Sequence, residues 1–554
     1  MDIRLTGGAP SAGEKAAVDS ILGPTEEPQD HVAHGGRIAR TRRPLLLPVL
    51  HAIQDQVGWI SRGGLDYAAR RLAVPPAEAY GVASFYGRFA LEPRPARTVH
   101  VCDDIVCMCN GGGELLKSYA DEAGVYPIAC LGLCDRAPAA LVEDAGPAPV
   151  STQVPATTTR TLVGGNGGLR LLARVGVVDP GSIESYVDAG GGKTLFRARE
   201  IGPERFIAEV TEAGLVGRGG AGFPTGRKWA AVAAAPAQPH YLVCNADESE
   251  PGTFKDRVLL EEDPFAVVEA ITVAAFATGS DKAYVYLRGE YPLARARMEN
   301  AVAQAREHDW FGDRFDIELF RGAWAYVCGE ETALFNSIEG KRGEPRNKPP
   351  FPVERGLFGK PTAINNVETL VNVLDLVPES NASRLFCLSG HVEHPGVYEA
   401  RMGTKLGELI EMAGGVRNGH RLQTVLLGGA AGTFLDPDRL DLPLTLDALR
   451  AAGATLGSGA VMLFDETVDL GQVLVRIARF FRQESCGQCV PCRVGTMRQE
   501  EIVRRIVGGN VLESRDREVA LLNDVARAMR DASICGLGQT AANAIESALG
   551  MLPR

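Results

Sequence analysis

Four cysteines in the last part of the chain carry the clearest chemical signal in the sequence. Cys486, Cys489 and Cys492 recur at every third position, and Cys535 follows farther along. Three thiolates at this spacing can hold three corners of an iron–sulfur cubane, and a remote thiolate can hold the fourth iron. A zinc site and a set of unligated core thiols are the alternatives. The spacing favours a [4Fe–4S] cluster, which moves one electron at a time.

A second group of cysteines lies nearer the N-terminus. It consists of Cys102 with Cys107 and Cys130 with Cys134, separated by a predicted helix. Two thiolate pairs on facing loops suit a [2Fe–2S] cluster, in which each iron takes two thiolates. Two pairs also fit a structural zinc site, and Cys109 is a spectator or an alternative ligand. We treat three scattered cysteines as structural, because free buried cysteine is common: Cys244, Cys328 and Cys387.

A glycine-rich segment, residues 217–229, contains five glycines within its first ten residues. Its GxGxxG match alone is weak, and residues 206–215 before it have a helical pattern rather than the strand of a dinucleotide-binding fingerprint. Glycines nevertheless let the backbone approach a flat or phosphorylated ligand closely, and a lysine supplies a cation. A merely flexible loop is the alternative, which the interleaved aromatic residues oppose. The candidate cofactor-binding residues here are Gly217, Arg218, Gly219, Gly220, Ala221, Gly222, Phe223, Gly226 and Lys228.

An acidic segment directly follows a predicted strand at residues 241–243. In open α/β sheets, ligands bind at the carboxyl ends of strands. Carboxylates at this place can bind ribose hydroxyls, and an asparagine can contact the edge of a flavin ring. A solvated acidic loop is the alternative. The candidate residues are Asn245, Asp247, Glu248 and Glu250.

A third set of polar residues is spread over residues 326–369. Glycine, paired glutamates and paired asparagines at predicted helix starts can form a polar pocket, in which helix N-termini face a phosphate. Taken separately, each could be helix capping. Their joint appearance beside the glycine-rich segment favours a cofactor site. The candidates are Tyr326, Gly329, Glu330, Glu331, Lys348, Phe351, Asn365, Asn366 and Thr369.

The composition is that of an ordinary globular protein, with 45% hydrophobic and 23% charged residues among 554. A formal net charge of −11 argues against nucleic acid or an anionic membrane as the main partner. No apolar run reaches the length needed to insert into a membrane, and no secretory signal is visible. Twelve cysteines are too few for a secreted disulfide scaffold, and their clustering indicates metal ligation in a reducing compartment. We therefore expect a cytoplasmic, soluble protein.

Hydrophobic periodicity divides the chain into several units, and the length predicts about three to four domains. Strands at 241–243 and 283–287, with helices at 264–277 and 293–305, predict a large α/β unit. A Pro-, Thr- and Gly-rich stretch before that unit predicts a linker. The predicted units are a flexible N-terminus at 1–35, a helical bundle at 36–95, a small α/β unit at 96–148, a linker at 149–169, the large α/β unit at 170–378, an α+β module at 379–466 and a helical domain at 467–554.

These motifs together resemble the NADH-binding flavoprotein subunit of respiratory complex I (NuoF type). The resemblance covers about residues 170–554 and rests on residues 217–229, 244–256, 286–290, 328–331, 348–352, 359–361, 365–369 and 484–493. Residues 48–55, residues 80–86 and the two early cysteine pairs resemble the NuoE-type [2Fe–2S] subunit, and residues 389–398 are similar to the ubiquitin-like SLBB domain. The implied fold class is α/β and α+β multidomain, with a helical bundle, a thioredoxin-like domain, a Rossmann-like FMN/NAD domain, an SLBB domain and a C-terminal helical bundle.

The resemblance also implies which cofactors the candidate residues bind. It implies NAD over residues 217–226, with Phe223, Glu250, Lys348 and Phe351 nearby. Ala231 stands where related chains often carry an aromatic residue, which leaves the ring packing around adenine open. No residue takes a catalytic role, because the hydride transfer takes place at FMN. FMN is implied around Lys228, Asn245, Asp247, Glu248, Tyr326, Gly329, Glu330, Glu331, Asn365, Asn366 and Thr369.

Fusion of the two subunits in one chain resembles the diaphorase subunits of soluble NAD-dependent formate dehydrogenases and of bidirectional NiFe hydrogenases (HoxF type). Residues 131–138 resemble the β subunit of the metal-dependent formate dehydrogenase most. The implied activity is exchange of a hydride between NAD and FMN and of single electrons with the [4Fe–4S] and [2Fe–2S] clusters. The expected partner is a formate-oxidising iron–sulfur subunit that carries molybdenum or tungsten. Hydrogenase subunits, an electron-input role in complex I and a zinc-stabilised binding scaffold are the alternatives.

Overall fold

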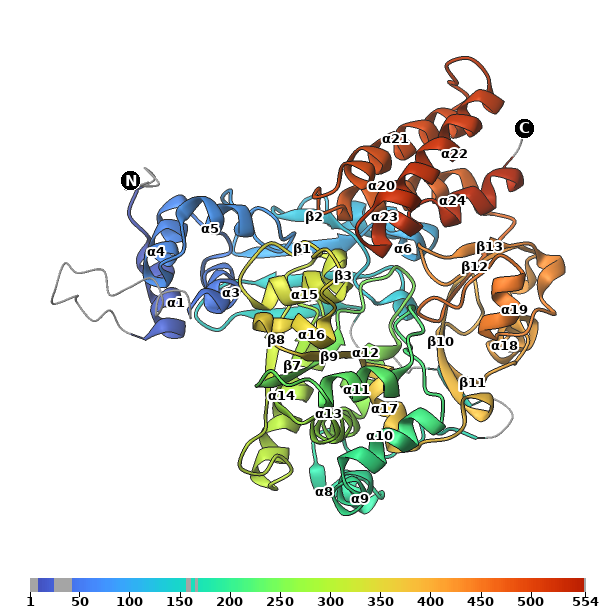
Figure 1. Cartoon of the computed structure of the whole chain (residues 1–554). Helices are drawn as coiled ribbons and strands as arrows, with labels where there is room; N and C mark the ends of the chain where they lie inside the picture. The colour runs from blue at the N-terminus through green and yellow to red at the C-terminus, as the bar shows by residue number, and fades with distance from the viewer. Residues whose placement is uncertain (1–7, 24–41, 156–160, 165–167, 553–554) are drawn as a thin grey trace.

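The chain folds into five connected units that pack on one another (Figure 1). The structure is a computed structural model and describes residues 8–23, 42–155, 161–164 and 168–552. The N-terminal helical bundle (blue) and the C-terminal helical domain (red) lie on two sides of a small four-stranded domain. Below these lies the parallel-sheet domain (green and yellow), with the six-stranded domain (orange) beside it. Among the described residues, no helix combines the length and apolarity needed to cross a membrane.

The N-terminal helical bundle is made of α1 (Ala12–Leu22), α3 (Leu46–Val57), α4 (Arg62–Leu72) and α5 (Pro76–Ala83). Helix α1 lies in the segment predicted to be flexible. A capping box explains it, because Ser11 and Glu14 bond each other's backbone N–H groups at 3.2 and 2.8 Å. Glu14 also accepts from the Ser61 backbone at 2.8 Å, and Val18 is fully buried. The rest of that prediction, residues 1–7 and 24–35, lies outside the described residues.

The small four-stranded domain has the strand order β2-β1-β3-β4, in which only β1 and β2 are parallel. Two short helices, α6 (Ile105–Cys109) and α7 (Gly112–Ser118), connect β1 to β2. Strand β4 lies in the predicted linker, where it extends the sheet by pairing with β3. The connection is therefore partly structured at its N-terminal end. The strands are β1 (Arg97–Cys102), β2 (Val125–Ile128), β3 (Ala140–Asp144) and β4 (Val150–Val154).

The parallel-sheet domain contains four parallel strands in the order β8-β7-β6-β9. They are β6 (His240–Ala246), β7 (Ser280–Leu287), β8 (Asp316–Arg321) and β9 (Thr362–Asn366). The order reverses between β6 and β9, which is where open α/β sheets bind ligands. The helices are α8 (Ile183–Asp188), α9 (Lys193–Ile201), α10 (Pro203–Glu212), α11 (Thr225–Ala233), α12 (Lys255–Glu262), α13 (Pro264–Thr278), α14 (Pro292–Glu307), α15 (Glu331–Ile338), α16 (Pro352–Arg355) and α17 (Val367–Val371).

The two faces of this parallel sheet belong to different apolar cores. Leu242 and Val285 pack in the core that includes α13, the helix that covers β6 and β7. Val243 and Tyr286, which alternate with them, pack in the core that includes α15 and the N-terminal helical bundle. Alternate side chains of a strand point to opposite faces, so one sheet joins both cores. The helical pattern before the glycine-rich segment is confirmed as α10.

The six-stranded domain has the order β13-β12-β14-β10-β11-β5 and two short helices, α18 (Leu406–Met412) and α19 (Leu446–Ala451). Strand β5 comes from the C-terminal part of the predicted linker and pairs in parallel with β11. The linker thus contributes one strand to the small four-stranded sheet and one to the six-stranded sheet. The strands are β5 (Thr161–Gly164), β10 (Ser383–Gly390), β11 (Gly396–Arg401), β12 (Leu422–Leu427), β13 (Thr433–Leu435) and β14 (Ala460–Asp465).

The C-terminal helical domain presents the loop of three cysteines between two long antiparallel helices. The apolar face of α20 is buried, with Val473, Ile477 and Phe481 fully covered. Helix α21 begins directly after Cys489, with a proline in its first turn where a missing N–H costs nothing. The helices are α20 (Leu470–Glu484), α21 (Val490–Val507), α22 (Arg515–Ala532), α23 (Gly536–Thr540) and α24 (Asn543–Ala548).

Candidate functional site

A cleft of about 750 Å³ opens at the carboxyl ends of β6 and β9, where the strand order reverses. The strand ends themselves bring Asn245 and Asn366 together, because these two residues are register partners. Most of the predicted cofactor-binding residues line this one cleft. They are Gly217, Gly219, Ala221, Gly222, Phe223, Lys228, Asn245, Gly329, Glu330, Glu331, Lys348, Phe351, Asn365, Asn366 and Thr369.

The glycine-rich segment forms a tight loop that leads into α11. The Gly217 N–H donates to the Phe223 carbonyl at 3.0 Å, and Gly222 has a φ of +62°, which favours glycine. A Cβ at Gly219 would lie 3.2 Å from the Asn366 side chain, so the loop passes close over the end of β9. The loop exposes Phe223 at the wall of the cleft. A glycine-rich backbone beside the exposed Phe223 ring suits a flat ligand.

Helix α11 places a lysine at the bottom of the cleft. The Lys228 Nζ donates to the Ile364 carbonyl at 2.7 Å, and burial lowers the pKa of this ammonium group. The neighbouring Trp229 is fully buried and donates from Nε1 to Asn365 Oδ1 at 2.9 Å. The tryptophan thus orients an asparagine near the end of β9. The ammonium keeps further donors for an anionic ligand.

The opposite wall carries a cation held between two carboxylates. Lys348 Nζ lies 2.9 Å from Glu330 and 2.6 Å from Glu331. Glu330 also caps α15 by accepting from the Thr332 and Ala333 backbones at 2.8 and 2.9 Å. The side chain of Glu330 therefore has a capping role and also fixes the lysine. The arrangement leaves polar groups in fixed positions at the mouth of the cleft.

A buried charge network supports the end of β9 and was not predicted. Asn366 Nδ2 donates to Asp256 Oδ2 at 2.5 Å. Lys255 Nζ lies 2.8 Å from Asp256 and 3.0 Å from Glu368, and all three charged groups are buried. The available signal was a Lys-Asp pair soon after the acidic segment. That signal could not be interpreted without knowing that α12 packs against α17.

Three predicted residues of the glycine-rich segment lie outside the lining of the cleft. The Arg218 guanidinium is fully buried and pairs with Glu379 through two contacts of 2.6 and 2.8 Å, while its backbone N–H donates to Thr369 at 2.8 Å. Gly226 packs so tightly on Thr211 that a Cβ there would collide with it. Gly220 has a φ of +113° and faces Gly457. These three residues help to fix the conformation of the glycine-rich loop, but they do not line the cleft.

Four predicted residues of the acidic segment and its surroundings also lie behind the cleft. Glu248 accepts from the backbones of the first α12 residues, at 3.0 Å each, and burial raises its pKa to about 8. Glu250 accepts from the Tyr326 hydroxyl and from the Ala431 backbone, and burial raises its pKa to about 7. Tyr326 lies in a 3-10 helix, η3 (Tyr326–Gly329).

The fourth of these residues, Asp247, leaves one oxygen unsatisfied. Its Oδ2 is buried and has no hydrogen-bond partner among the described residues, and burial raises the pKa of this carboxyl to about 8. A Cβ at Gly329, which lines the cleft, would lie 3.7 Å from this oxygen. Because Gly329 has no side chain, that residue does not cover the Asp247 carboxyl on the cleft side. An unsatisfied buried oxygen behind a glycine fits a ligand that supplies a hydrogen bond there.

The cleft has further lining residues that the sequence did not indicate. The loop of the C-terminal helical domain closes one side of it with Cys535, a predicted cluster ligand. Because helices and strands from opposite ends of the chain meet here, no local pattern could identify this wall. The additional lining residues are Arg227, Ala231, Pro352, Val353, Ile364, Ile534, Gly536 and Gln539.

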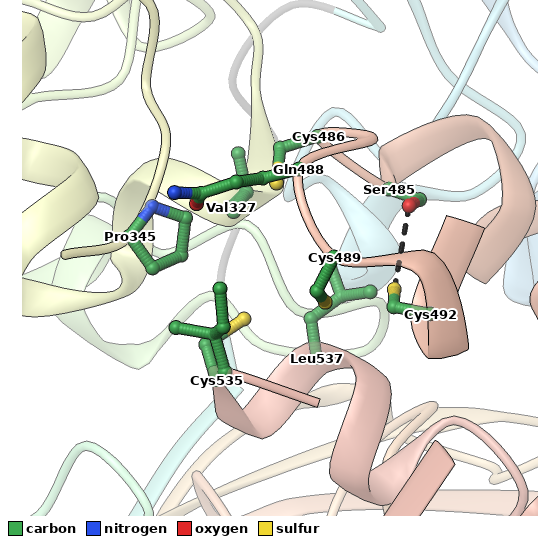
Figure 2. Close-up of a pocket in the computed structure, with 10 residues that line it drawn as sticks. Val327, Pro345, Ser485, Cys486, Gln488, Cys489, Cys492, Cys535 and Leu537 are labelled. Carbon is green, nitrogen blue, oxygen red and sulfur yellow. Dashed lines mark hydrogen bonds between the residues drawn. The ribbon is translucent and has the colours of Figure 1, made fainter. Parts of the chain in front are cut away.

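The four C-terminal cysteines surround one small cavity, shown in Figure 2. Cys486 and Cys489 lie in the loop before α21, Cys492 lies in its first turn, and Cys535 precedes α23. Cys492 Sγ lies 3.3 Å from Ser485 Oγ. Burial raises the pKa of the Cys492 thiol to about 12. Apolar side chains of Val327, Pro345 and Leu537 close the cavity.

The four thiols of this cavity come from three places: the loop before α21, its first turn and the residue before α23. Four cysteines around a common cavity can each hold one corner of a cubane. The donor set therefore fits a [4Fe–4S] cluster.

The N-terminal cysteine pairs lie together at one end of the small four-stranded domain. Cys102 ends β1, Cys107 lies in α6, and all four thiols are buried. Cys130 and Cys134 approach each other to 3.4 Å between their sulfur atoms. Two such pairs match the two irons of a [2Fe–2S] cluster. Cys109 is half-buried, and its carbonyl accepts from His391 at 3.2 Å.

The [2Fe–2S] loop packs directly on the loop that follows β6. Arg288 is buried and donates to the Cys130 carbonyl and to the Glu248 carbonyl, each at 2.6 Å. Arg257 pairs with Asp135 at 2.6 Å, and both side chains are buried. One arginine thus bridges two cofactor-site loops, and the other locks the small four-stranded domain onto the parallel-sheet domain.

Four family models match the chain. They are the Nuo51 FMN-binding domain over residues 210–375, the thioredoxin-like [2Fe-2S] ferredoxin over 36–160, the NADH-ubiquinone oxidoreductase-F iron-sulfur binding region over 472–553 and the SLBB domain over 385–430. The matches confirm the predicted fold class and the predicted FMN, NAD, [2Fe–2S] and [4Fe–4S] cofactors.

Individual relatives agree with the family models. The F 2 subunit of NADH-quinone oxidoreductase in Rhizobium meliloti (strain 1021) is 42% identical over 400 residues, which cover 68% of this chain and 94% of that one. The NADP-reducing hydrogenase subunit HndC of Solidesulfovibrio fructosivorans is 39% identical over 406 residues, which cover 69% of this chain and 81% of that one. A chain in the crystal structure of an air-oxidized NAD+-reducing [NiFe]-hydrogenase is 33% identical with a TM-score of 0.79, and the match covers 92% of this chain and 93% of that one.

Proposed function

The chain belongs to the family of NADH-binding FMN diaphorase subunits that complex I and NAD-reducing hydrogenases share, and from this membership we propose its place in a larger enzyme. We propose that it is the NAD-reducing subunit of a multi-subunit formate dehydrogenase. In this role it accepts electrons from a partner that oxidises formate at a molybdenum or tungsten centre and passes them to NAD⁺.

The observation that carries the diaphorase part is the double position of Cys535. This cysteine lines the cleft and also the cavity of the [4Fe–4S] site. Bound in the cleft, FMN would supply hydride exchange with a nicotinamide and single-electron exchange with a cluster. The chain's own contribution is to place the two sites side by side, with the loop that carries Cys535 lining both.

The residues of the cleft divide into those that bind and those that orient. Lys228 would hold a phosphate, and the exposed rings of Phe223 and Phe351 would cover flat ring systems. Asn245 donates to the Gly329 carbonyl at 2.9 Å, which fixes the strand end under the ligand. The unsatisfied Oδ2 of Asp247 would accept a hydrogen bond that the ligand donates past Gly329. No side chain is needed as an acid or base, because the chemistry requires alignment and exclusion of water.

The outer face of the [4Fe–4S] site supports a partner subunit. Val490, Val494 and Met497 lie at one helical face of α21, next to the cluster cysteines, and all three are exposed. Exposed apolar side chains in a group indicate an interaction surface. Arg493 lies among them, and within the described part of the chain its guanidinium donates only to the Gly487 carbonyl, at 2.9 Å. This surface suits an iron–sulfur partner with a carboxylate opposite the arginine.

The formate linkage rests on residues 131–138 of the [2Fe–2S] loop and on the fusion of both subunit types in one chain. The second candidate is the diaphorase subunit of a bidirectional [NiFe]-hydrogenase. It is favoured by the match to the hydrogenase chain, which extends over 92% of this chain, whereas the complex I relative covers 68%.

The two candidates differ in the electron donor, so the test is to supply each donor. The tagged chain would be purified from its own host with the subunits that accompany it, and NAD⁺ reduction would be followed with formate and then with hydrogen. Reduction with formate alone, together with molybdenum or tungsten in the complex, supports the proposal. Reduction with hydrogen alone, together with nickel, would contradict it in favour of the hydrogenase. Absence of flavin, or no ferricyanide reduction by NADH, would refute the diaphorase role itself.

A further inference from the structure

A second pocket of about 600 Å³ lies on the other side of the segment that walls the cleft. We call it the basic pocket. Pro350 lines the basic pocket, and the next residue, Phe351, lines the cleft. The cleft and the basic pocket are therefore bordered by neighbouring residues of one chain segment. The basic pocket is lined by Arg43, Pro44, Thr332, Glu339, Lys341, Arg346, Asn347, Pro350, Arg355, Phe358 and Gly359.

The lining of the basic pocket contains four cations and one carboxylate. That carboxylate, Glu339, already receives Lys341 at 2.6 Å, Arg346 at 2.8 Å and the Phe358 N–H at 2.9 Å. Although burial opposes the shift, the hydrogen bonds from Lys341 and Arg346 hold the pKa of Glu339 below its ordinary value. Glu339 is thus ionised, and its carboxylate oxygens already accept from protein donors. The pocket keeps an excess of positive charge in a chain whose net charge is −11.

Several hydrogen-bond donors of the basic pocket have no protein acceptor. In the described part of the chain, the Arg355 guanidinium makes no hydrogen bond or ion pair, and neither does the Asn347 amide. The Lys341 ammonium has three donors and uses one on Glu339. By contrast, Arg346 is fixed on Asn336 at 2.9 and 2.7 Å. These solvent-exposed donors are free to bind a ligand rich in acceptors in place of water.

The basic pocket also has an apolar, aromatic side. The Phe358 ring is 37% exposed and packs edge-on against Tyr241 at 5.7 Å between ring centres. Its backbone has a φ of +52°, which is unusual for a bulky residue and costs about 1–3 kcal/mol. Residues held in such conformations cluster at ligand sites. Pro44 and Pro350 extend the apolar side.

We propose that the basic pocket binds an organic phosphate of the nucleotide type and that its occupancy changes the affinity of the cleft for the nicotinamide. The phosphate lies on Lys341 and Arg355, and the flat part of the ligand lies on Phe358. Guanidinium and ammonium groups are the usual phosphate ligands in proteins.

The coupling runs through the shared segment. The Arg346 N–H donates to Thr332 Oγ1 at 2.8 Å, in the first turn of α15. Two residues farther along the segment, Lys348 pairs with Glu330 and Glu331 at the start of the same helix. A ligand that holds Arg355 and Pro350 in place therefore restricts Phe351 and Lys348 on the cleft side. The binding half of the proposal stands without the proposed function, whereas the coupling half rests on it.

The test is a calorimetric titration of the full chain, loaded with flavin and iron, with ADP and with inorganic pyrophosphate. Saturating NAD⁺ keeps both probes out of the cleft. Arg355→Glu and Lys341→Glu should each weaken ADP binding about 10- to 100-fold, the loss of one charge-assisted contact. Phe358→Ala should weaken ADP binding and leave pyrophosphate binding unchanged. Arg450→Glu, an exposed arginine on α19, is the matched control and should bind as the unsubstituted chain does.

Saturable ADP binding that the two charge reversals weaken and the control does not would support the site. No saturable binding, or equal binding by all variants, would overturn it. The KM for NADH in ferricyanide reduction should shift severalfold when ADP saturates the basic pocket and stay constant in Arg355→Glu. A constant KM in the unsubstituted chain would overturn the coupling. Flavin content, measured on the same samples, separates both results from a failure of the diaphorase role.

Discussion

Removal of the Asp135 carboxylate should loosen the small four-stranded domain from the parallel-sheet domain. The Arg257 guanidinium is fully buried and lies 2.6 Å from Asp135, with Glu261 at 3.5 Å as its other carboxylate. In Asp135→Ala, the buried Arg257 loses its nearest counter-charge, and the buried Arg136 loses a contact of 3.5 Å with the same carboxylate. Breaking a buried pair from one side costs about 3–5 kcal/mol. That cost corresponds to roughly a 150- to 5,000-fold rise in the population of the undocked state.

The assay is amide hydrogen exchange of β1 and β3, because these strands report opening of the small domain. The control is Arg97→Ala, which removes an exposed ion pair with Asp144 on the same sheet and should cost about 0.2–1 kcal/mol. The double variant Asp135→Ala with Arg257→Met replaces the pair by apolar groups and should recover most of the lost protection.

Two results would refute this reasoning. One is protection of β1 in Asp135→Ala equal to that in Arg97→Ala, which would mean that the buried pair does not hold the domain. The other is a double variant no better protected than Asp135→Ala, which would mean that the unpaired Arg257 charge is not the cause of the loss. The visible spectrum of the [2Fe–2S] cluster, recorded in parallel, shows whether the iron is retained.

Four further predictions concern the site itself. Cys535→Ala should abolish the [4Fe–4S] signal in electron paramagnetic resonance and keep the [2Fe–2S] signal. Cys109→Ser should keep both signals. Loss of either cluster in Cys109→Ser would make this residue a ligand. Phe223→Ala should raise the KM for NADH about three- to tenfold at unchanged kcat, because a stacking wall is lost; an unchanged KM would remove Phe223 from the binding site. Lys228→Ala should weaken FMN retention about 10- to 100-fold by fluorescence titration, and full occupancy would count against the flavin site. Burial raises the pKa of Glu250 from 4.5 to about 7, so its contribution to stability is complete below 4.5 and is lost as the pH rises towards 7. The melting temperature should therefore fall between pH 4.5 and 7, and Glu250→Gln should make this fall shallower. An equally steep fall in the variant would disprove this role of Glu250.

The sequence predicted the fold best where periodicity was strong. The strand at 241–243 and the helix at 264–277 are confirmed within β6 and α13, because long apolar runs leave few other solutions. Strands β4 and β5 were hidden in a stretch of Pro, Thr and Gly, since they are held by pairing with β3 and β11 rather than by their own composition. Helix α1 was missed because its stability depends on the contact of Glu14 with a residue far along the chain.

The candidate site shows where local patterns stop being informative. The cysteine spacing predicted two cluster sites, and the structure gathers the four C-terminal cysteines around one cavity and buries the four N-terminal ones, because the separation of thiols along the chain depends on ligand geometry. The acidic segment was less informative, since its carboxylates look alike in sequence and differ only in what they face. Glu248 faces the start of a helix, and Glu250 faces a tyrosine hydroxyl. The Arg218 side chain likewise pairs with Glu379, a partner 161 positions away.

The shared wall at Cys535 ties the assembly of one prosthetic group to that of the other. The loop with the predicted iron ligand Cys535 also closes a side of the cleft, so we expect a chain produced without iron to have a less rigid boundary there. Flavin should then leak from iron-starved preparations even though none of its own ligands has changed. For this protein, the yellow colour of a sample is an indirect measure of how well the cell supplied it with iron and sulfide.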